Sequence, residues 1–478
     1  MADIAYSRYL DHTAINMGLD INLFRKEKGG DPELVRASQK KRFRAQEDID
    51  IVDKIVAADE EWRKRNFQTE QLKKEYKVQL KVIADKKKAS KGEDKCEEEI
   101  EKSQAMAKEV QKHEEETEIF RKEIDKMLAR CGNIVDDSVP VSNDEVNNAV
   151  VRTWGKPSDL KITNTPGACY HHQILAMIDG YDPKRGQKVA GHRGYFLKGP
   201  GALLNLALIQ YATKFLCTRE YTPISTPLFM KKQIMGETCQ LADFDDQLYK
   251  IDSKDKTEEK DDLYLIATSE QPISGYFRGE WLEQAELPVR FGGYSTCFRK
   301  EAGAAGKDTW GIFRVHQFEK IEQFCVTHPD KSEEEHERMI GIAEEFYQTL
   351  KLPYQVVNIV SGELNDAASK KYDLEAWFPG YNTFRELVSS SNCTDYQSRG
   401  LDVRLRIPKN QQKALDKPEK PFVHMLNATL CATTRTLCCI LENYQEEKGV
   451  RVPEVLVPFM GTDFIPYIKP VPKKEDLQ

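Results

Sequence analysis

Residues 298–322 read FRKEAGAAGKDTWGIFRVHQFEKIE and predict two strands joined by a glycine-bearing loop. Side chains of one parity share a face of a strand. On the second strand the even positions are Arg314, His316, Phe318, Lys320 and Glu322. By the same rule Arg299 and Glu301 share a face of the first strand. The hairpin is therefore predicted to gather two arginines, two carboxylates and a phenyl ring on one surface.

Such a surface suits a nucleotide together with an amino acid. Arginine binds phosphate as a permanent, bidentate cation, an aromatic ring stacks on a base, and carboxylates accept hydrogen bonds from amino groups. A single alternating strand is more often the polar face of a solvated hairpin. The pairing of two such strands across one loop favours the binding site.

Composition limits the other possibilities. The 478 residues allow two or three domains, and 71 basic against 78 acidic residues give a net charge of -7, so any nucleic-acid binding must be local. The eleven cysteines form no CxxC pair and predict reduced thiols without structural zinc. No apolar run has the length of a membrane span, and the first twenty residues carry no signal or transit pattern, so we expect a cytoplasmic protein.

The segment from Asp31 to Cys131 has the composition of long helices, with a single glycine and no proline after Pro32. Alternating steps of four and three predict a coiled-coil seam along its second half. The seam positions are His113, Thr117, Phe120, Ile124, Met127, Cys131 and Ile134. A break at ASKGE, residues 89–93, predicts a turn and hence an antiparallel helical hairpin.

The two arms of this hairpin differ in charge. From Trp62 to Lys91 there are eleven basic residues and three acidic ones, whereas the second arm is acidic on balance. The arms can neutralise each other along the seam, but one side of each helix stays exposed. We therefore predict that the basic arm meets nucleic-acid phosphates. The candidate contacts are Arg63, Lys64, Arg65, Lys73, Lys74, Lys77 and Lys81.

The remaining chain predicts an α+β domain around a mainly antiparallel sheet. A linker is expected at 132–155, helices at 201–216, 331–350 and 435–447, and strands at 223–230, 263–270, 354–360, 372–378, 383–388 and 425–429. Within the strand at 263–270, Thr268 and Glu270 are two residues apart and are predicted to share a face.

Six stretches occur in the order and spacing of one known family. They are YTPISTPLF (221–229), IATSEQP (266–272), the stretch quoted above, YDLEAWFP (372–379), FRELVSSSNCTDYQSR (384–399) and LNATLCATTRTLCCILENYQ (426–445). From residue 17 to 470 the chain resembles class II aminoacyl-tRNA synthetases, and most closely the cytosolic seryl-tRNA synthetases of eukaryotes. The resemblance implies a disordered extension at 1–16, a tRNA-binding helical hairpin domain at 17–136 and a catalytic domain at 137–478.

The activity implied by the resemblance is activation of L-serine with ATP and its transfer to tRNA-Ser; whether tRNA-Sec is also charged stays open. Arg299 and Arg435 would act on the reacting phosphate, and Pro227 would lie at a homodimer interface. ATP would be bound by Arg299, Glu301, Arg314, Phe318, Glu386, Ser389 and Arg435, and Mg²⁺ by Glu386 and Ser389. Serine would be bound by Thr268, Glu270, Arg299, Glu322, Asn427 and Thr429.

One consequence for local structure follows. Glu386 and Ser389 are three residues apart and cannot share a face of a regular strand, so a shared magnesium site requires a bulge or a strand end between them.

Two other functions remain open from the sequence. A catalytically silent RNA-binding or scaffold relative would not need the set of charged pocket residues named above. A ligase that loads an amino acid onto a carrier protein would not need the basic hairpin. The chain also departs from the family around Ala304, Ala305 and Lys307, in a loop that contacts the RNA acceptor end in relatives.

Overall fold

The computed structural model describes residues 18–91, 93–159, 168–239, 247–252, 262–301, 310–408 and 420–472. The chain divides into two compact units. The helical unit comprises Gly18–Lys40 with Arg44–Gly132, and the catalytic unit comprises Lys41–Phe43 with the chain from Asn133 onward. The predicted extension at 1–16 and the loop positions Ala304, Ala305 and Lys307 lie outside the described residues.

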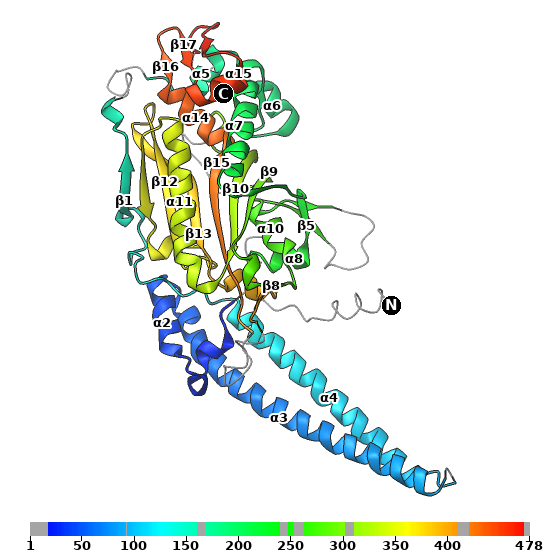
Figure 1. Cartoon of the computed structure of the whole chain (residues 1–478). Helices are drawn as coiled ribbons and strands as arrows, with labels where there is room; N and C mark the ends of the chain where they lie inside the picture. Colours follow the sequence, from blue (N-terminus) through cyan, green and yellow to red (C-terminus); the bar gives the residue numbers. More distant parts are fainter. Residues whose placement is uncertain are drawn as a thin grey trace. The chain divides into compact units, whose positions relative to one another are not determined.

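The helical unit is the predicted antiparallel hairpin. Its long arms are α3 (Gln46–Ala89) and α4 (Glu97–Leu128), preceded by α2 (Pro32–Lys41) (Figure 1). On the seam the hydroxyls of Thr69 and Thr117 lie 3.2 Å apart, and the Arg65 guanidinium lies over the Phe120 ring at 5.2 Å. The seam prediction was wrong at Cys131 and Ile134, because α4 ends at Leu128 and these positions follow it.

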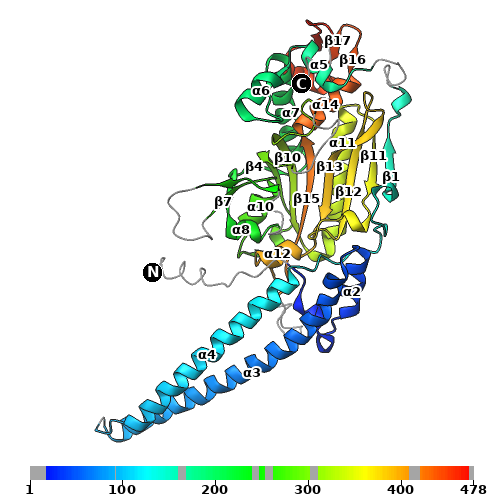
Figure 2. The same cartoon turned by 180° about the vertical axis from the view of Figure 1, so that it is seen from behind.

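The second unit is built on an eight-stranded sheet in the order β1-β11-β12-β13-β15-β10-β9-β4 (Figure 2). Its strands are β1 (Ala149–Trp154), β4 (Thr222–Ser225), β9 (Val289–Phe298), β10 (Gln317–Thr327), β11 (Tyr354–Asn358), β12 (Lys370–Phe378), β13 (Thr383–Asn392) and β15 (His424–Ala432). The pair β4–β9 is parallel and the other neighbours are antiparallel, which confirms the predicted sheet type.

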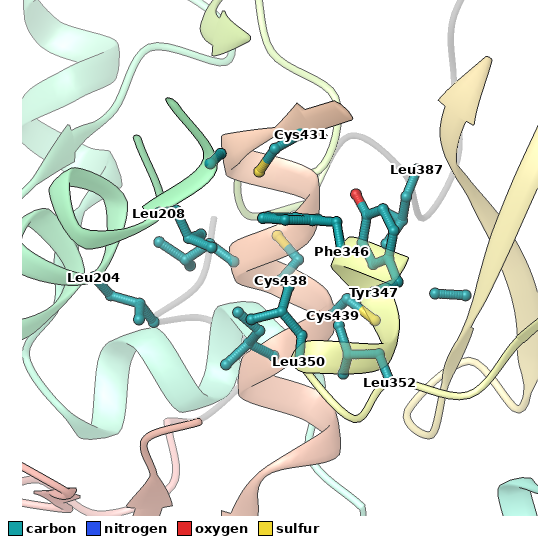
Figure 3. Close-up of a cluster of buried hydrophobic side chains, with 14 of the residues drawn as sticks. Leu204, Leu208, Phe346, Tyr347, Leu350, Leu352, Leu387, Cys431, Cys438 and Cys439 are labelled. Atoms are coloured by element: carbon teal, nitrogen blue, oxygen red, sulfur yellow. The ribbon is translucent and has the colours of Figure 1, made fainter. Parts of the chain in front are cut away.

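Three helices close the core against this sheet: α7 (Gly199–Cys217), α11 (Ser332–Thr349) and α14 (Thr433–Asn443). α11 lies across the face seen in Figure 1, and the opposite face is turned toward the viewer in Figure 2. Leu204 and Leu208 of α7, Phe346 and Tyr347 of α11, and Cys438 and Cys439 of α14 belong to one buried cluster (Figure 3). Burial of these apolar side chains is the main stabilising term for the unit.

Smaller elements surround this core. The helices are α5 (His171–Met177), α6 (Pro183–Ala190), α8 (Lys232–Gly236), α10 (Glu270–Tyr276), α12 (Tyr396–Gly400) and α15 (Val457–Met460). The strands are β2 (Tyr181–Asp182), β3 (Phe196–Leu197), β5 (Phe229–Lys231), β6 (Lys250–Ile251), β7 (Leu263–Leu265), β8 (Trp281–Glu283), β14 (Arg404–Arg406), β16 (Gln445–Glu446), β17 (Gly449–Arg451) and β18 (Phe464–Pro466). In the part of the chain that the structure describes, no helix has the length and apolar character of a membrane span.

Other predictions of local structure were also wrong. The expected strand at 223–230 is two short strands, β4 and β5. The expected linker contains the edge strand β1, whose side chains are mostly exposed, so it lacks the alternating buried positions that mark a strand in the sequence. Thr268 and Glu270 do not share a strand, because β7 ends at Leu265 and Glu270 is the first residue of α10.

Candidate active site

The face of the sheet opposite α11 carries an open pocket. In β10 the Gln323 side chain donates to the Met339 carbonyl oxygen of α11 at 3.0 Å, so its neighbour Glu322 faces the other side. Farther along this side, Phe324 packs with Ile273 of α10 and with Leu401 after α12. The rest of the face stays uncovered by these helices and forms the pocket.

The pocket is lined by residues from widely separated stretches of the chain. It brings together Arg299, Glu301, Arg314, Phe318, Glu386, Ser389, Thr429 and Arg435, all predicted as site residues, with Phe313, Val315, Lys320, Leu387, Ala432 and Thr434. The predicted gathering of arginines, carboxylates and a phenyl ring is therefore present in the structure.

The local reason for this gathering differs from the prediction. β9 ends at Phe298 and β10 begins at Gln317, so Arg299, Glu301, Arg314 and His316 lie in the connection and not on the strands. The backbone NH of Arg299 still donates to the His316 carbonyl oxygen at 2.9 Å, but Glu301 has a φ of 50°, which breaks the extended conformation. The parity rule holds only within β10.

Two arginines of the pocket lie over aromatic rings that also line it. The Arg299 guanidinium lies 5.4 Å from the Phe318 ring centre, and that of Arg435 lies 4.9 Å from the Phe313 ring centre. Arg314 Nε donates to Glu301 Oε2 at 2.5 Å. A flat base with attached phosphates suits such a set of π faces and bidentate cations.

Arg435 is the third residue of α14, as the prediction of a helix start required. Its Nη1 donates to Glu386 Oε2 at 3.1 Å. This contact orients the guanidinium within the lining of the pocket, where it can meet an anionic ligand.

Glu322 is only 2% exposed and is not one of the lining residues, but it contacts two of them, Lys320 and Thr429. The other residues predicted for serine that do not line the pocket are Thr268, Glu270 and Asn427. Glu322 Oε1 accepts hydrogen bonds from Thr429 Oγ1 at 3.1 Å and from Thr268 Oγ1 at 3.5 Å, and it forms an ion pair with Lys320. Three residues predicted for serine therefore meet at one carboxylate oxygen. The sequence placed Lys320 on the correct face of β10 but did not identify it as a site residue. The available signal was its positive charge two positions before the carboxylate of Glu322 on the same strand face.

Glu270 and Asn427 approach the same region from α10 and β15. Glu270 Oε1 accepts from Gln397 Nε2 at 2.7 Å, and burial raises the pKa of Glu270 although this hydrogen bond opposes the rise. Asn427 Nδ2 donates to Cys393 Sγ at 3.6 Å. Gln397 and Cys393 were not predicted as site residues. Their contacts with Glu270 and Asn427 depend on the path of the chain after β13, which the sequence pattern does not show.

The expected bulge lies between Glu386 and Ser389. In the pairing of β12 with β13, Glu375 is opposite Glu386 and Leu374 is opposite Val388, so Leu387 is the extra residue. Glu386 and Ser389 consequently both line the pocket. Asp373, opposite Ser389 in the register, is buried, and burial raises its pKa to about 7.

These oxygen donors suit a hard divalent cation. Carboxylate and hydroxyl oxygens are the ligands that Mg²⁺ prefers, and Oδ1 of the buried Asp373 has no hydrogen-bond partner in the described part of the chain. Across the same described residues there is no group of three or more His, Cys, Asp or Glu side chains arranged to hold a metal ion. Glu386 and Ser389 both offer oxygen atoms of this kind to the pocket that they line.

The basic residues predicted for RNA divide into two groups on α3. Arg63 pairs with Asp59 at 3.0 Å, Arg65 with Glu61 at 2.9 Å, and Lys73 with Glu114 at 2.8 Å. The other four are exposed and have no ion pair among the described residues: Lys64, Lys74, Lys77 and Lys81. The second group is the more exposed of the two.

Pro227 lies between β4 and β5 and is exposed in the single chain. Leu203 and Leu206 of α7 are also large, exposed apolar residues, each about half accessible at 51%. Exposed apolar side chains of this kind are common at subunit interfaces.

Comparison with known proteins accounts for this combination of sheet, pocket and hairpin. Residues 249–444 match the family profile described as "tRNA synthetase class II core domain (G, H, P, S and T)", so the catalytic unit is that of a class II aminoacyl-tRNA synthetase. Residues 19–135 match the "Seryl-tRNA synthetase N-terminal domain". This match, together with relatives that are 50% identical over almost their whole length, shows that the chain belongs to the seryl-tRNA synthetase family.

Two curated relatives are cytoplasmic serine–tRNA ligases. The protein of Dictyostelium discoideum is 50% identical over 96% of this chain and 97% of its own length, and that of Saccharomyces cerevisiae is 50% identical over 95% and 97%.

Two solved structures extend the likeness to the fold. The cytoplasmic serine-tRNA ligase of Naegleria fowleri in complex with AMP has a TM-score of 0.81 and 46% identity, covering 95% of this chain and all of that one. The seryl-tRNA synthetase of Pyrococcus horikoshii complexed with ATP also has a TM-score of 0.81, at 39% identity, over 94% of this chain and all of that one. The predicted family and fold class are confirmed.

Proposed function

We propose that this protein is a cytoplasmic serine–tRNA ligase, which activates L-serine with ATP to seryl-adenylate and transfers the seryl group to tRNA-Ser. The observation that carries the proposal is the single pocket in which Arg299, Arg435 and Phe318 adjoin the Glu322–Thr429 pair. Phosphate- and base-binding groups thus lie beside a polar site for a small hydroxyl-bearing amino acid.

The first step needs positioning and charge rather than a protein nucleophile. A serine carboxylate oxygen attacks the α-phosphorus of ATP, the bond to the bridging oxygen breaks, and pyrophosphate leaves. Arg299 stabilises the negative charge that grows on the α-phosphate, while Arg314 and Arg435 bind the outer phosphates. Phe318 stacks on adenine, and Glu301 accepts from its amino group.

Transfer follows from the same site. A terminal ribose hydroxyl of the tRNA attacks the carbonyl carbon of the adenylate and loses its proton to solvent. The bond between this carbon and the phosphate oxygen breaks, and AMP leaves with that oxygen. Holding both reactants in one geometry supplies much of the rate.

Selection of serine rests on the contacts of Glu322. Glu322 and Thr429 bond the substrate hydroxyl, while Glu270 and Thr268 take the ammonium group and Asn427 completes the pocket. A site built to hydrogen-bond a hydroxyl rejects an analogue without it by roughly 10⁴- to 10⁵-fold, since its polar groups would stay unpaired. Alanine is therefore excluded without a separate editing step.

The divalent ion that ATP-dependent synthetases of this class use would be Mg²⁺, held by Glu386 and Ser389. It would neutralise phosphate charge when bound with ATP. The protein would act as a homodimer with Pro227 at its interface, supported by the exposed apolar residues of α7 near β4.

The helical hairpin would bind tRNA-Ser by its phosphate backbone. The exposed lysines of α3 support this role, since neutralised phosphates release counterions and so favour association.

Serine-dependent exchange of pyrophosphate into ATP tests the proposal. Exchange with serine, and none above background with glycine or alanine, is the expected result. Absence of exchange would favour a silent RNA-binding relative. Exchange without charging of tRNA-Ser, but with loading of a carrier protein, would favour the ligase alternative.

A further inference from the structure

Asn133 is a buried polar residue to which the mechanism above gives no role. It is 4% exposed, and its Nδ2 lies 2.9 Å from each of three acceptors: the carbonyl oxygens of Ala367 and Cys393 and the hydroxyl of Thr394. Its backbone NH donates to the Asp366 carbonyl oxygen at 2.7 Å. One side chain therefore joins the loop before β12 to the turn after β13.

Arg42 is hydrogen-bonded to the backbone of Asn133. Arg42 is also 4% exposed, and its Nε donates to the Asn133 carbonyl oxygen at 2.9 Å. Its Nη1 donates to the Asn365 carbonyl oxygen at 3.1 Å and its Nη2 to that of Ala368 at 2.5 Å. Hydrogen bonds from a charged donor are stronger than neutral ones. The rigid guanidinium group therefore holds the backbone at Asn133 close to the loop at residues 365–368.

The turn to which Asn133 is hydrogen-bonded, Cys393–Thr394, also contacts Asn427, one of the residues assigned to serine. Cys393 is buried, and its Sγ accepts from Asn427 Nδ2 at 3.6 Å. The backbone NH of Cys393 donates to the Met425 carbonyl oxygen at 3.1 Å, and that of Met425 donates to Thr394 at 2.9 Å. Any displacement of the turn is thus passed to β15, the strand that carries Asn427 and Thr429.

Arg42 and Asn133 also stand where the chain passes between the two units. Lys41–Phe43 belongs to the catalytic unit although both flanking segments belong to the helical unit, and Asn133 is the first residue after the helical unit ends. Within the helical unit, Gln39 and Gly132 exchange two hydrogen bonds of 3.0 Å. The two chain segments that connect the units are therefore hydrogen-bonded to each other on either side of the boundary, through Gln39 and Gly132 in the helical unit and through Arg42 and Asn133 in the catalytic unit.

We infer that Arg42 and Asn133 are positioning residues of the serine site, acting through the Cys393–Thr394 turn on Asn427. The inference rests on the proposed function, which assigns Asn427 to serine. A buried clamp of this kind sets the placement of a pocket side chain without touching the substrate. Its loss therefore weakens serine binding more than ATP binding.

The test measures apparent KM values for serine and for ATP separately, by pyrophosphate exchange, together with thermal unfolding. For Asn133→Ala and Arg42→Lys we expect the KM for serine to rise about tenfold, and that for ATP to stay within about twofold. Cys393→Ala cuts the last link with little change in volume and should raise the KM for serine in a protein that unfolds near the wild-type temperature.

The matched control is Gln39→Ala, which removes a buried hydrogen-bond pair at the same connection but within the helical unit. It should lower the unfolding temperature and leave both KM values unchanged. The inference would be overturned if the KM for serine stayed unchanged in Cys393→Ala and in whichever of the other two variants folds. It would also be overturned if the KM values for serine and for ATP rose equally. Absence of serine-dependent exchange in the wild type would instead overturn the proposed function.

Discussion

At the scale of single residues, Thr429 gives the sharpest test of the serine site. Its hydroxyl donates to Glu322, and Thr429→Val removes this donor while keeping the side-chain volume. A hydrogen bond to a charged group contributes about 1.5–3 kcal/mol, so kcat/KM for serine in the exchange reaction should fall by roughly ten- to a hundredfold. Thr429→Ser keeps the hydroxyl and serves as control. Equal activity of all three proteins would remove Thr429 from the site.

His336 makes stability depend on pH. Its Nε2 lies 3.0 Å from the Ser390 carbonyl oxygen, its ring stacks on Tyr372, it is 1% exposed, and burial lowers its pKa to about 4. In the unfolded chain the imidazole of His336 binds a proton below about pH 6.5, whereas in the folded protein it does so only near pH 4. The stability that His336 contributes is therefore full above pH 6.5 and is lost as pH falls to 4, by about 1.4 kcal/mol per pH unit.

Urea unfolding at several pH values between 4.5 and 7 measures this effect. We expect His336→Gln to show a shallower loss of stability toward acid than the wild type. The buried His172, whose pKa of about 3 has burial as its largest cause, is present in both proteins and cancels in the comparison. Parallel pH curves would contradict the assignment to His336.

At the scale of elements, the sequence predicted most helices and strands but not how their ends shape the pocket. α7, α11 and α14 lie close to the helices expected at 201–216, 331–350 and 435–447, and the bulge at Leu387 follows from requiring two ligands on one face. Glu301 could not be placed correctly, because its positive φ is set by the connection between β9 and β10 and leaves no mark in the local pattern.

The α3 helix supports a prediction about RNA. Changing Lys64, Lys74, Lys77 and Lys81 together to Glu should weaken binding of tRNA-Ser and lower the slope of log Kd against log salt by up to about 0.7–0.9 for each lost phosphate contact. Filter binding at several salt concentrations measures this, while serine-dependent exchange without RNA should not change.

A control with the same change in charge is available on α4. Lys102, Lys108, Lys112 and Lys122 are also exposed, and changing them to Glu alters the net charge of the hairpin equally. We expect this variant to lose less affinity than the α3 variant. Equal losses would mean that overall charge, and not the outer face of α3, governs binding.

At the scale of the whole molecule, the parts that the sequence could not supply are contacts between distant stretches. Glu322 meets Thr429 through the pairing of β10 with β15, and Gln397 reaches Glu270 across 127 positions of the chain. Periodicity reports which face a side chain takes, but not which strand will be its neighbour. The ordered motifs identified the family, and the sheet order then determined which residues share the pocket.

The division into units predicts that serine activation and RNA charging can be separated. Replacing residues 66–119 by a short Gly-Ser turn joins Arg65 to Phe120, which face each other on the seam, and keeps the contact between Trp62 and Arg121. Because the pocket residues all belong to the catalytic unit, serine-dependent exchange should stay within about twofold of the wild type. Charging of tRNA-Ser should fall by about a hundredfold or more, since each lost phosphate contact lowers affinity. Charging at the wild-type rate by the shortened protein would show that the hairpin does not bind the RNA, whereas loss of exchange would show that the units depend on each other for folding.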